Sequence, residues 1–201
     1  MSPRKYVMDR RMAASGATRR RVVEAAVALH GERGTAATRW ADIAERADVA
    51  LGTVYRYFPS NDELIPACTS HAAQFTRPPT PDIFRGEPAG AARIAILVRE
   101  SFAFYERAAT WLRHGIGDRR RVPALDRIYR RNEEAYEGLV RLALGPGGRA
   151  HAVDATVALT SFSSWSTLHD RGLSTSEAAA LVTDLLTRWL SGNRPNRRNP
   201  T

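Results

Sequence analysis

The stretch TRWADIAERADVALGTVYRYFPSNDEL, residues 38–64, decides the fold. Its first part places apolar residues at helical spacing over barely two turns, residues 39–47, and Thr38 can cap the start. Residues 48–50 then form a tight connector, and a second short helix is expected over residues 51–57. The pattern therefore predicts two short helices with about three residues between them.

Longer helices are expected on either side of this pair. Residues 18–34 carry apolar side chains at helical spacing, and Gly34 suits a left-handed exit. Pro59 stops the second short helix, and a further helix runs from Ser60 to about Phe75. This is the helix-turn-helix plan, in which the second short helix lies in a major groove of DNA.

The second short helix is expected to have one buried and one DNA-facing side. At 100° per residue, Val54 and Phe58 share a face that packs against the preceding helices. The remaining side chains offer hydroxyls, a guanidinium and flat rings to phosphates and base edges: Thr53, Tyr55, Arg56 and Tyr57. Gly52 lets the backbone come close to the sugar-phosphate wall. The alternative is that the aromatic residues are only core, which is the expected role of Phe58 and stays open for Tyr55.

Composition bounds the class of protein. A chain of 201 residues can be one large domain or a small domain joined to a larger one, and no strand-like alternation is found. No apolar run reaches the roughly 18 residues of a membrane span, and the N-terminus has no signal-peptide core. Cys68 is the single cysteine, so no internal disulfide is expected. We expect a cytoplasmic all-α protein without a membrane partner.

The charge is concentrated at the two ends. The net charge is +9, and residues 1–22 hold seven basic residues against Asp9 alone. The last residues add Arg194, Arg197 and Arg198 without an acid. Both ends are expected to be disordered. They serve either solubility or the attraction of phosphates.

Residues 18–64 resemble the N-terminal DNA-binding domain of the TetR family of transcriptional repressors. The motifs that carry the resemblance are GERG at the end of the first helix, ADIAERADV in the second, GTVYRYF in the third and PSNDEL at the start of the fourth. The resemblance implies that Thr53, Tyr55 and Tyr57 meet DNA, with Gly52 in close approach. It also implies that Thr38 meets a phosphate at the start of the second helix.

Several positions depart from the family pattern. His30 replaces the usual phenylalanine, Asp48 a glycine and Ala50 a serine that commonly starts the recognition helix. Ala41 and Asn61 stand where an arginine and a phosphate-binding lysine are common. We hypothesise that the arginine-rich arm before Thr18 makes up the lost phosphate contacts.

The resemblance also implies that the helix beginning at Ser60 links the DNA-reading domain to the body of the protein. Pro66 lies inside that helix and is expected to kink it. After Phe75, a linker with four prolines precedes the body. Helices are expected there over residues 89–108, 111–116, 123–144, 150–170 and 174–190. The expected domains are 1–17, a flexible basic arm; 18–64, helix-turn-helix; 65–192, effector binding and dimerisation; and 193–201, a disordered tail.

The last two helices are apolar over more than one stripe and need a further partner. The resemblance implies that they pair with a second copy as a four-helix bundle. The expected interface residues are Val157, Phe162, Trp165, Leu181, Leu185 and Trp189. Two recognition helices would then face successive major grooves about 34–36 Å apart, so the operator is expected to be a near-palindrome.

The body is also expected to hold a small-molecule effector, whose identity the sequence does not give. Aromatic side chains and one histidine are candidates to line its pocket: Phe102, Tyr105, Trp111, His114, Tyr129, Tyr136, Phe162 and Trp165. Each of them has core packing as the alternative. The most favoured function is a repressor released from its operator by the effector. The alternatives are an activator and a ligand-independent nucleic-acid-binding module.

An enzyme is disfavoured by the sequence. The five histidines have no metal-ligand spacing, Cys68 has no evident base, and no phosphate-binding glycine loop occurs. No metal or cofactor is therefore expected.

Overall fold

The computed structural model describes residues 3–146 and 149–192, with side chains from Met12 onward. Within those ranges the regular structure is helical and no strand occurs, which confirms the all-α class. The predicted disordered tail, residues 193–201, lies outside the described residues. None of the described helices is both long and apolar enough to cross a bilayer.

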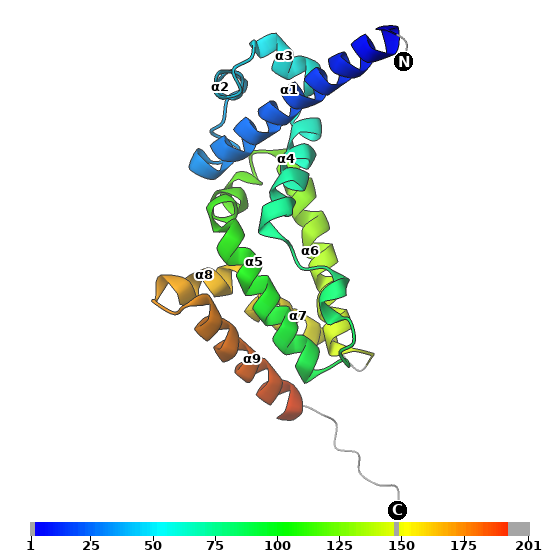
Figure 1. Ribbon diagram of the computed structural model, residues 1–201. Helices are drawn as coiled ribbons and strands as arrows, with labels where there is room; N and C mark the ends of the chain where they lie inside the picture. Colours follow the sequence, from blue (N-terminus) through cyan, green and yellow to red (C-terminus); the bar gives the residue numbers. More distant parts are fainter. Residues whose placement is uncertain (1–2, 147–148, 193–201) are drawn as a thin grey trace, which may run out of the picture. The chain divides into compact units, whose positions relative to one another are not determined.

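The chain divides into two compact units (Figure 1). The first contains α1 (Pro3–Arg33), α2 (Trp40–Arg46), α3 (Leu51–Tyr57) and α4 (Asn61–Thr76), together with residues 109–130. The second contains residues 77–108 and those after 130, with a 3₁₀ helix η1 (Pro81–Phe84), α7 (Ala150–Leu159), α8 (Phe162–Asp170) and α9 (Thr175–Gly192). Two helices contribute to both units: α5 (Ala91–Asp118) and α6 (Pro123–Leu144).

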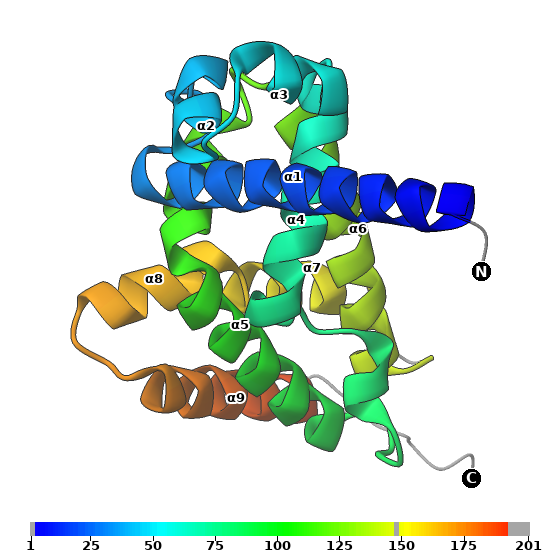
Figure 2. The same cartoon turned by 45° about the horizontal axis from the view of Figure 1, so that its top comes forward.

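The core of the first unit forms where α2, α3 and α4 pack on α1 (Figure 2). It includes buried residues that the helical spacing predicted: Val22, Val23, Ala26, Val27 and Leu29 from α1, Ile43, Ala44 and Ala47 from the α2 region, and Val54 and Phe58 from the α3 region. Ala25, Leu64 and Cys68 are buried with them, whereas Trp40 is only partly buried. Burial of a side chain such as Val54 or Phe58 contributes about 1.5–3 kcal/mol each. The bounds of α3 and α6 agree with those expected from the sequence.

The first helix is much longer than predicted. It begins at Pro3, so the expectation of a disordered arm before Thr18 is wrong for residues 3–17. Lack of an apolar stripe suggested disorder, but arginine, methionine and alanine are strong helix formers, and proline suits the first helical position. Once residues 22–29 are held in the core, further turns add without a new nucleation step.

The predicted division of α5 into helices 89–108 and 111–116 is wrong, because one helix runs from Ala91 to Asp118. Its last turns belong to the first unit: the Trp111 indole Nε1 donates to the Val27 carbonyl at 2.9 Å. Asp118 Oδ2 accepts from the Ala36 backbone N–H at 3.0 Å. Residues 109–130, which the sequence placed in the effector domain, therefore belong to the unit that contains α1 to α4.

The predicted helix over residues 150–170 is broken between α7 and α8. Ser161 caps α8 by accepting from the Ser164 backbone N–H at 3.2 Å. The Tyr105 hydroxyl donates to the Thr160 carbonyl at 3.1 Å, and the Tyr136 hydroxyl donates to the Thr160 Oγ1 at 2.7 Å. Hydrogen bonds from two other helices, α5 and α6, stabilise the break. The apolar spacing within residues 150–170 gives no information about these bonds.

Three further expectations concern the capping box of α9, the proline-rich linker and Pro66. The capping box at the start of α9 is confirmed, since Glu177 N–H donates to Ser174 Oγ at 3.2 Å and Ser174 N–H donates to Glu177 Oε2 at 2.9 Å. The proline-rich linker contains the short helix η1 and buries Phe84. Pro66 lies inside a continuous α4, and the kink stays a prediction.

Candidate DNA-binding surface

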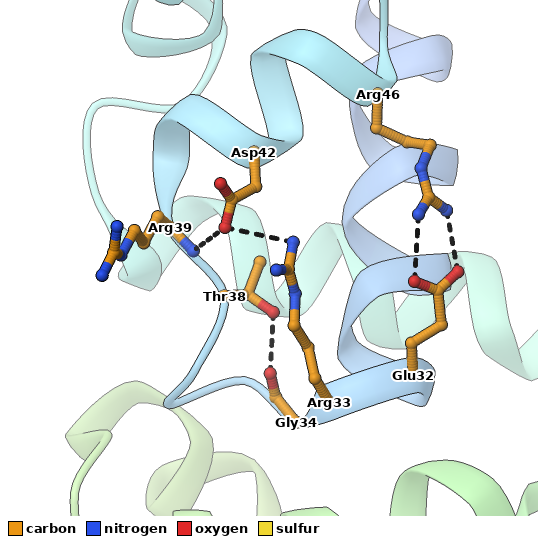
Figure 3. Close-up of polar contacts among 7 residues, drawn as sticks. All are labelled: Glu32, Arg33, Gly34, Thr38, Arg39, Asp42 and Arg46. Carbon is orange, nitrogen blue, oxygen red and sulfur yellow. Dashed lines mark hydrogen bonds and ion pairs between the residues drawn. The ribbon is translucent and has the colours of Figure 1, made fainter.

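Ion pairs to the end of α1 hold α2 in place (Figure 3). The Arg46 guanidinium donates to both Glu32 oxygens, at 2.8 and 2.9 Å, and this bond holds the pKa of Glu32 below its usual value. Asp42 Oδ2 pairs with Arg33 at 3.0 Å and accepts from the Arg39 backbone N–H at 3.2 Å. Such exposed pairs contribute little to stability, because water and salt screen them. Their effect is to fix the orientation of α2 on α1.

Thr38 does not cap α2 as predicted. Its hydroxyl donates backward to the Gly34 carbonyl at 2.7 Å, and Arg39 occupies the N-cap position (Figure 3). The left-handed backbone at Gly34, with φ of 86°, turns the chain so that this bond forms. The contact of Thr38 with a phosphate stays a prediction.

Arg39 is a candidate that sequence reasoning missed. Its exposed guanidinium points away from the Asp42 carboxylate in Figure 3, at the start of α2. A basic residue next to an N-cap threonine was the available signal.

The turn between α2 and α3 depends on a left-handed residue. Asp48 has φ of 52°, and the Val49 N–H donates to the Ala44 carbonyl at 3.0 Å, as in a Schellman motif. Aspartate tolerates this conformation better than most residues with a Cβ, which is why it can replace glycine here. Arg21 reinforces the turn by donating from Nη2 to the Asp48 carbonyl at 3.3 Å.

Helix α3 has the two sides that the sequence predicted. Val54 and Phe58 are buried, and the side chains of Tyr55 and Arg56 are exposed. Thr53 and Tyr57 are half-buried. The N-cap Ala50 supplies no side-chain bond, as expected.

The rings of Tyr55 and Tyr57 are held by different neighbours. Tyr55 stacks on Trp40 of α2, with ring centroids 5.1 Å apart and planes 21° from parallel. The Tyr57 hydroxyl lies 2.8 Å from the Ser15 hydroxyl of α1, and the Arg56 guanidinium lies 5.0 Å from the Tyr57 ring centroid. Both phenols are thereby oriented at the surface before any ligand binds.

Gly52 has no internal reason to be glycine. A Cβ built at this exposed position meets no atom within 4 Å, and its backbone is ordinary helix. If glycine is required at this position, the requirement must come from a molecule outside the protein. This agrees with the predicted close approach of Gly52 to DNA, which stays a prediction.

The candidate pocket residues fall into two groups. In the second unit, Tyr105 lies beside three other candidate rings, with centroids 6.2 Å from Phe102, 5.7 Å from Phe162 and 6.4 Å from Trp165. Tyr136 belongs with them through its contacts to Ser101 at 3.1 Å and to Thr160. Burial raises the pKa of both Tyr105 and Tyr136.

The other three candidates belong to the first unit. Trp111 packs so closely on α1 that a Cβ at Gly31 would lie 3.1 Å from its Nε1. Tyr129 packs on Gly115, where a Cβ would collide with its hydroxyl. His114 is exposed. These residues have structural partners of their own, and a ligand-lining role for them stays a prediction.

The candidate interface residues differ in how much of their surface is exposed. Leu181, Leu185 and Trp189 expose 42%, 49% and 38% of their surface, as an unpartnered face requires. Trp165 is only 1% exposed within its own protomer, so its assignment to an interface is corrected. Val157 and Phe162 are half-buried.

The fold and surface define an all-helical protein with a helix-turn-helix at its N-terminus. Residues 22–68 match the family model of bacterial regulatory proteins, tetR family. The HTH-type transcriptional repressor KstR of Rhodococcus jostii (strain RHA1) is 49% identical over 47 residues, a match that covers 23% of this chain and 22% of KstR. The match thus spans less than a quarter of that relative.

Solved structures extend the likeness of the fold beyond this segment. A TetR transcriptional regulator from Rhodococcus sp. RHA1 aligns with a TM-score of 0.52 at 22% identity, over 89% of this chain and 98% of that one. The multidrug binding protein EbrR complexed with imidazole aligns with a TM-score of 0.62 at 20% identity, over 85% and 88%. The likeness to this family in sequence covers residues 22–68, and beyond them the solved structures show a similar fold.

The matched family model is described as one of regulatory proteins, and KstR as a transcriptional repressor. Among the described side chains, no group of three or more His, Cys, Asp or Glu residues is placed to hold a metal ion.

Proposed function

We propose that this protein is a transcriptional repressor that binds a double-stranded DNA operator as a homodimer and is released by a small-molecule effector. One observation carries the proposal. The donors and rings of Thr53, Tyr55, Arg56 and Tyr57 lie on the outer side of a short helix whose other side, Val54 and Phe58, is buried. A helix anchored in this way can enter a major groove without losing its own core.

The exposed apolar face of α9 supports the homodimer. Leu181, Leu185 and Trp189 recur at helical spacing, and exposure of three large apolar side chains on one face is costly in water. A second copy of α8 and α9 would cover them as a four-helix bundle. Two recognition helices then face grooves one turn apart, so the operator is a near-palindrome.

The aromatic group around Tyr105 supports an effector site in the second unit. It gathers flat rings beside hydroxyls of Tyr136 and Thr160, the mixture of groups that small-molecule sites use. The effector would be a largely apolar molecule with few polar groups. Activation instead of repression, or binding without any effector, are the outcomes that would replace this part of the proposal.

The basic start of α1 supports additional phosphate contacts. Residues 1–11 contain Arg4, Lys5, Arg10 and Arg11 against Asp9, and the helical backbone extends them beyond the core. We propose that they replace the phosphate contacts missing at Ala41 and Asn61. Deleting residues 1–11 should lower affinity and flatten the salt dependence, by about 0.9 in the log–log slope per lost contact. An unchanged slope would reject this role.

The decisive experiment is electrophoretic and fluorescence titration of the full chain with duplexes from the DNA flanking its own gene. We expect a specific complex with two protomers per site, and at least one member of a small-molecule library should dissociate it. Binding that is equally tight to all duplexes would reject an operator. Sedimentation of a monomer at the concentrations where DNA binds would reject the homodimer.

A further inference from the structure

A hydrogen bond joins two exposed side chains that are 42 positions apart. The hydroxyl oxygens of Ser15 in α1 and Tyr57 in α3 lie 2.8 Å from one another. Ser15 lies outside residues 22–68, the segment that matches the family model. It is present at this place only because α1 begins at Pro3 and not near Thr18. The extended part of α1 thus touches the recognition helix.

The two residues border a depression that is open to solvent. Its lining comes from one turn of α1 and the end of α3: Ala14, Ser15, Thr18, Arg56 and Tyr57. The Thr18 hydroxyl donates to the Ala14 carbonyl at 3.0 Å, so its hydrogen is already used. One hydroxyl hydrogen of the Ser15–Tyr57 pair is used in their mutual bond, so a ligand can receive the other one and those of the Arg56 guanidinium.

We propose that Ser15 is a positioning residue for DNA binding, which holds the Tyr57 hydroxyl so that Tyr57 and Arg56 together bind one backbone phosphate in this depression. The inference rests on the proposed function, because it requires that α3 meets DNA. The Ser15 hydroxyl donates to the Tyr57 oxygen, and the Tyr57 hydroxyl donates outward to a phosphate oxygen. The Arg56 guanidinium donates to a second oxygen of the same phosphate.

The chemistry of this chain of donors favours an anion. A hydroxyl that accepts one hydrogen bond is polarised and becomes a stronger donor of the next. In agreement, the hydrogen bond with Ser15 is the main cause that lowers the pKa of Tyr57, and the nearby Arg56 acts in the same direction.

The test is a double-mutant cycle with full-length protein. The probe is a duplex selected from a randomised library by the wild-type protein. Ser15→Ala should weaken binding about threefold to tenfold, the range of one hydrogen bond. Tyr57→Phe should weaken it about tenfold. In the Tyr57→Phe background, Ser15→Ala should cause no further loss, because Ser15 acts through the missing hydroxyl.

The control is Ser70→Ala, which removes the same atom from an exposed helical serine of α4 and should leave affinity unchanged. Alanine is the stronger helix former, so loss of binding by Ser15→Ala does not follow from loss of helix. Failure of the wild-type protein to select any duplex would overturn the proposed function. Selection of a duplex that Ser15→Ala binds as tightly as wild type would overturn only the present inference. Equal losses in both backgrounds would also overturn it.

A second measurement separates positioning from a direct contact of Ser15 with DNA. Single phosphates of the duplex are replaced by neutral methylphosphonates. At one particular phosphate, the replacement should abolish the difference in DNA affinity between wild type and Ser15→Ala. The same replacement should abolish the difference in DNA affinity between wild type and Tyr57→Phe. Titration of ring-labelled tyrosine by NMR should show a higher pKa of Tyr57 in Ser15→Ala without DNA. Different phosphates for the two variants, or an unchanged pKa, would overturn the positioning role.

Discussion

The two units differ in how far local sequence determines their helices. In the first unit, α3 runs over the residues that the pattern predicts and buries Val54 and Phe58. In the second unit, a continuous apolar pattern is broken at Thr160 and Ser161. A short helix with one apolar side has one way to pack. A longer apolar segment has several, and the choice falls to partners from elsewhere in the chain, here Tyr105 and Tyr136.

The largest effect is expected at Phe58, the buried residue that anchors α3. Phe58→Ala should lower the free energy of unfolding by about 3–5 kcal/mol, because it empties a fully buried site between α1 and α4. Chemical denaturation measures it. The matched control is Phe75→Ala, whose ring is 43% exposed and should cost far less. Equal losses would show that α3 is not anchored as described.

The next largest effect concerns His30 in the first unit. Burial lowers its pKa from 6.5 to about 4, and the charge of Asp118 opposes this shift. The unfolded chain therefore binds a proton that the folded chain excludes. The stabilising effect of neutral His30 is fully present above about pH 6.5 and is lost as the pH falls towards 4. Between pH 7 and pH 5 the loss should be about 2 kcal/mol.

Replacement of His30 by phenylalanine should remove this part of the pH dependence. Chemical denaturation at several pH values compares His30→Phe with wild type, and His114→Gln, at an exposed position, serves as the control. An identical acid slope in His30→Phe and wild type would contradict the buried neutral histidine.

The second unit is tested at the helix break. Thr160→Val removes the hydroxyl that accepts from Tyr136 and donates to the Thr156 carbonyl at 2.6 Å. We expect a loss of about 1–2 kcal/mol in the free energy of unfolding. Thr156→Val is the matched control, equally buried but bonded only to Ala152 of its own helix, and should cost less. A larger loss in the control would show that the cross-helix bonds do not hold the break.

The smallest effect on stability is expected at Gly52, where a substitution should raise stability but weaken DNA binding. Gly52→Ala should stabilise the free protein by about 0.5–1 kcal/mol, since alanine is the better helix former and meets no neighbour. The same change should weaken binding to the selected duplex, because the methyl group enters the space of the sugar-phosphate wall. Thermal melts and DNA titration measure the two. Unchanged DNA affinity would remove Gly52 from the proposed surface.

Much of the DNA-binding surface follows from sequence, because its residues are close in the chain. Rotation of 100° per residue places Val54 and Phe58 opposite Arg56 without knowledge of the fold. The Ser15 contact with Tyr57 could not be foreseen, since it depends on a segment that was expected to be disordered and joins residues 42 positions apart. Arg39 was missed for a smaller reason, an N-cap that lies one residue later than Thr38.

The aromatic residues of the body were harder to place. Side chains such as Trp111 and Tyr105 look alike in sequence, yet Trp111 donates to Val27 of α1 and Tyr105 to Thr160 beside α8. Helical spacing shows which residues are apolar on a face. It does not show which helix the face meets.

By itself, the sequence determined the helical class, the short α2 and α3 and the outward side of the recognition helix, because these follow from apolar spacing, turns and prolines within a few residues. Tertiary structure alone decided that the end of α5 joins the first unit, that α7 and α8 separate at Thr160, and that Ser15 meets Tyr57. Those outcomes depend on hydrogen bonds and packing between residues far apart in the chain, and such bonds have no period that a linear sequence can display.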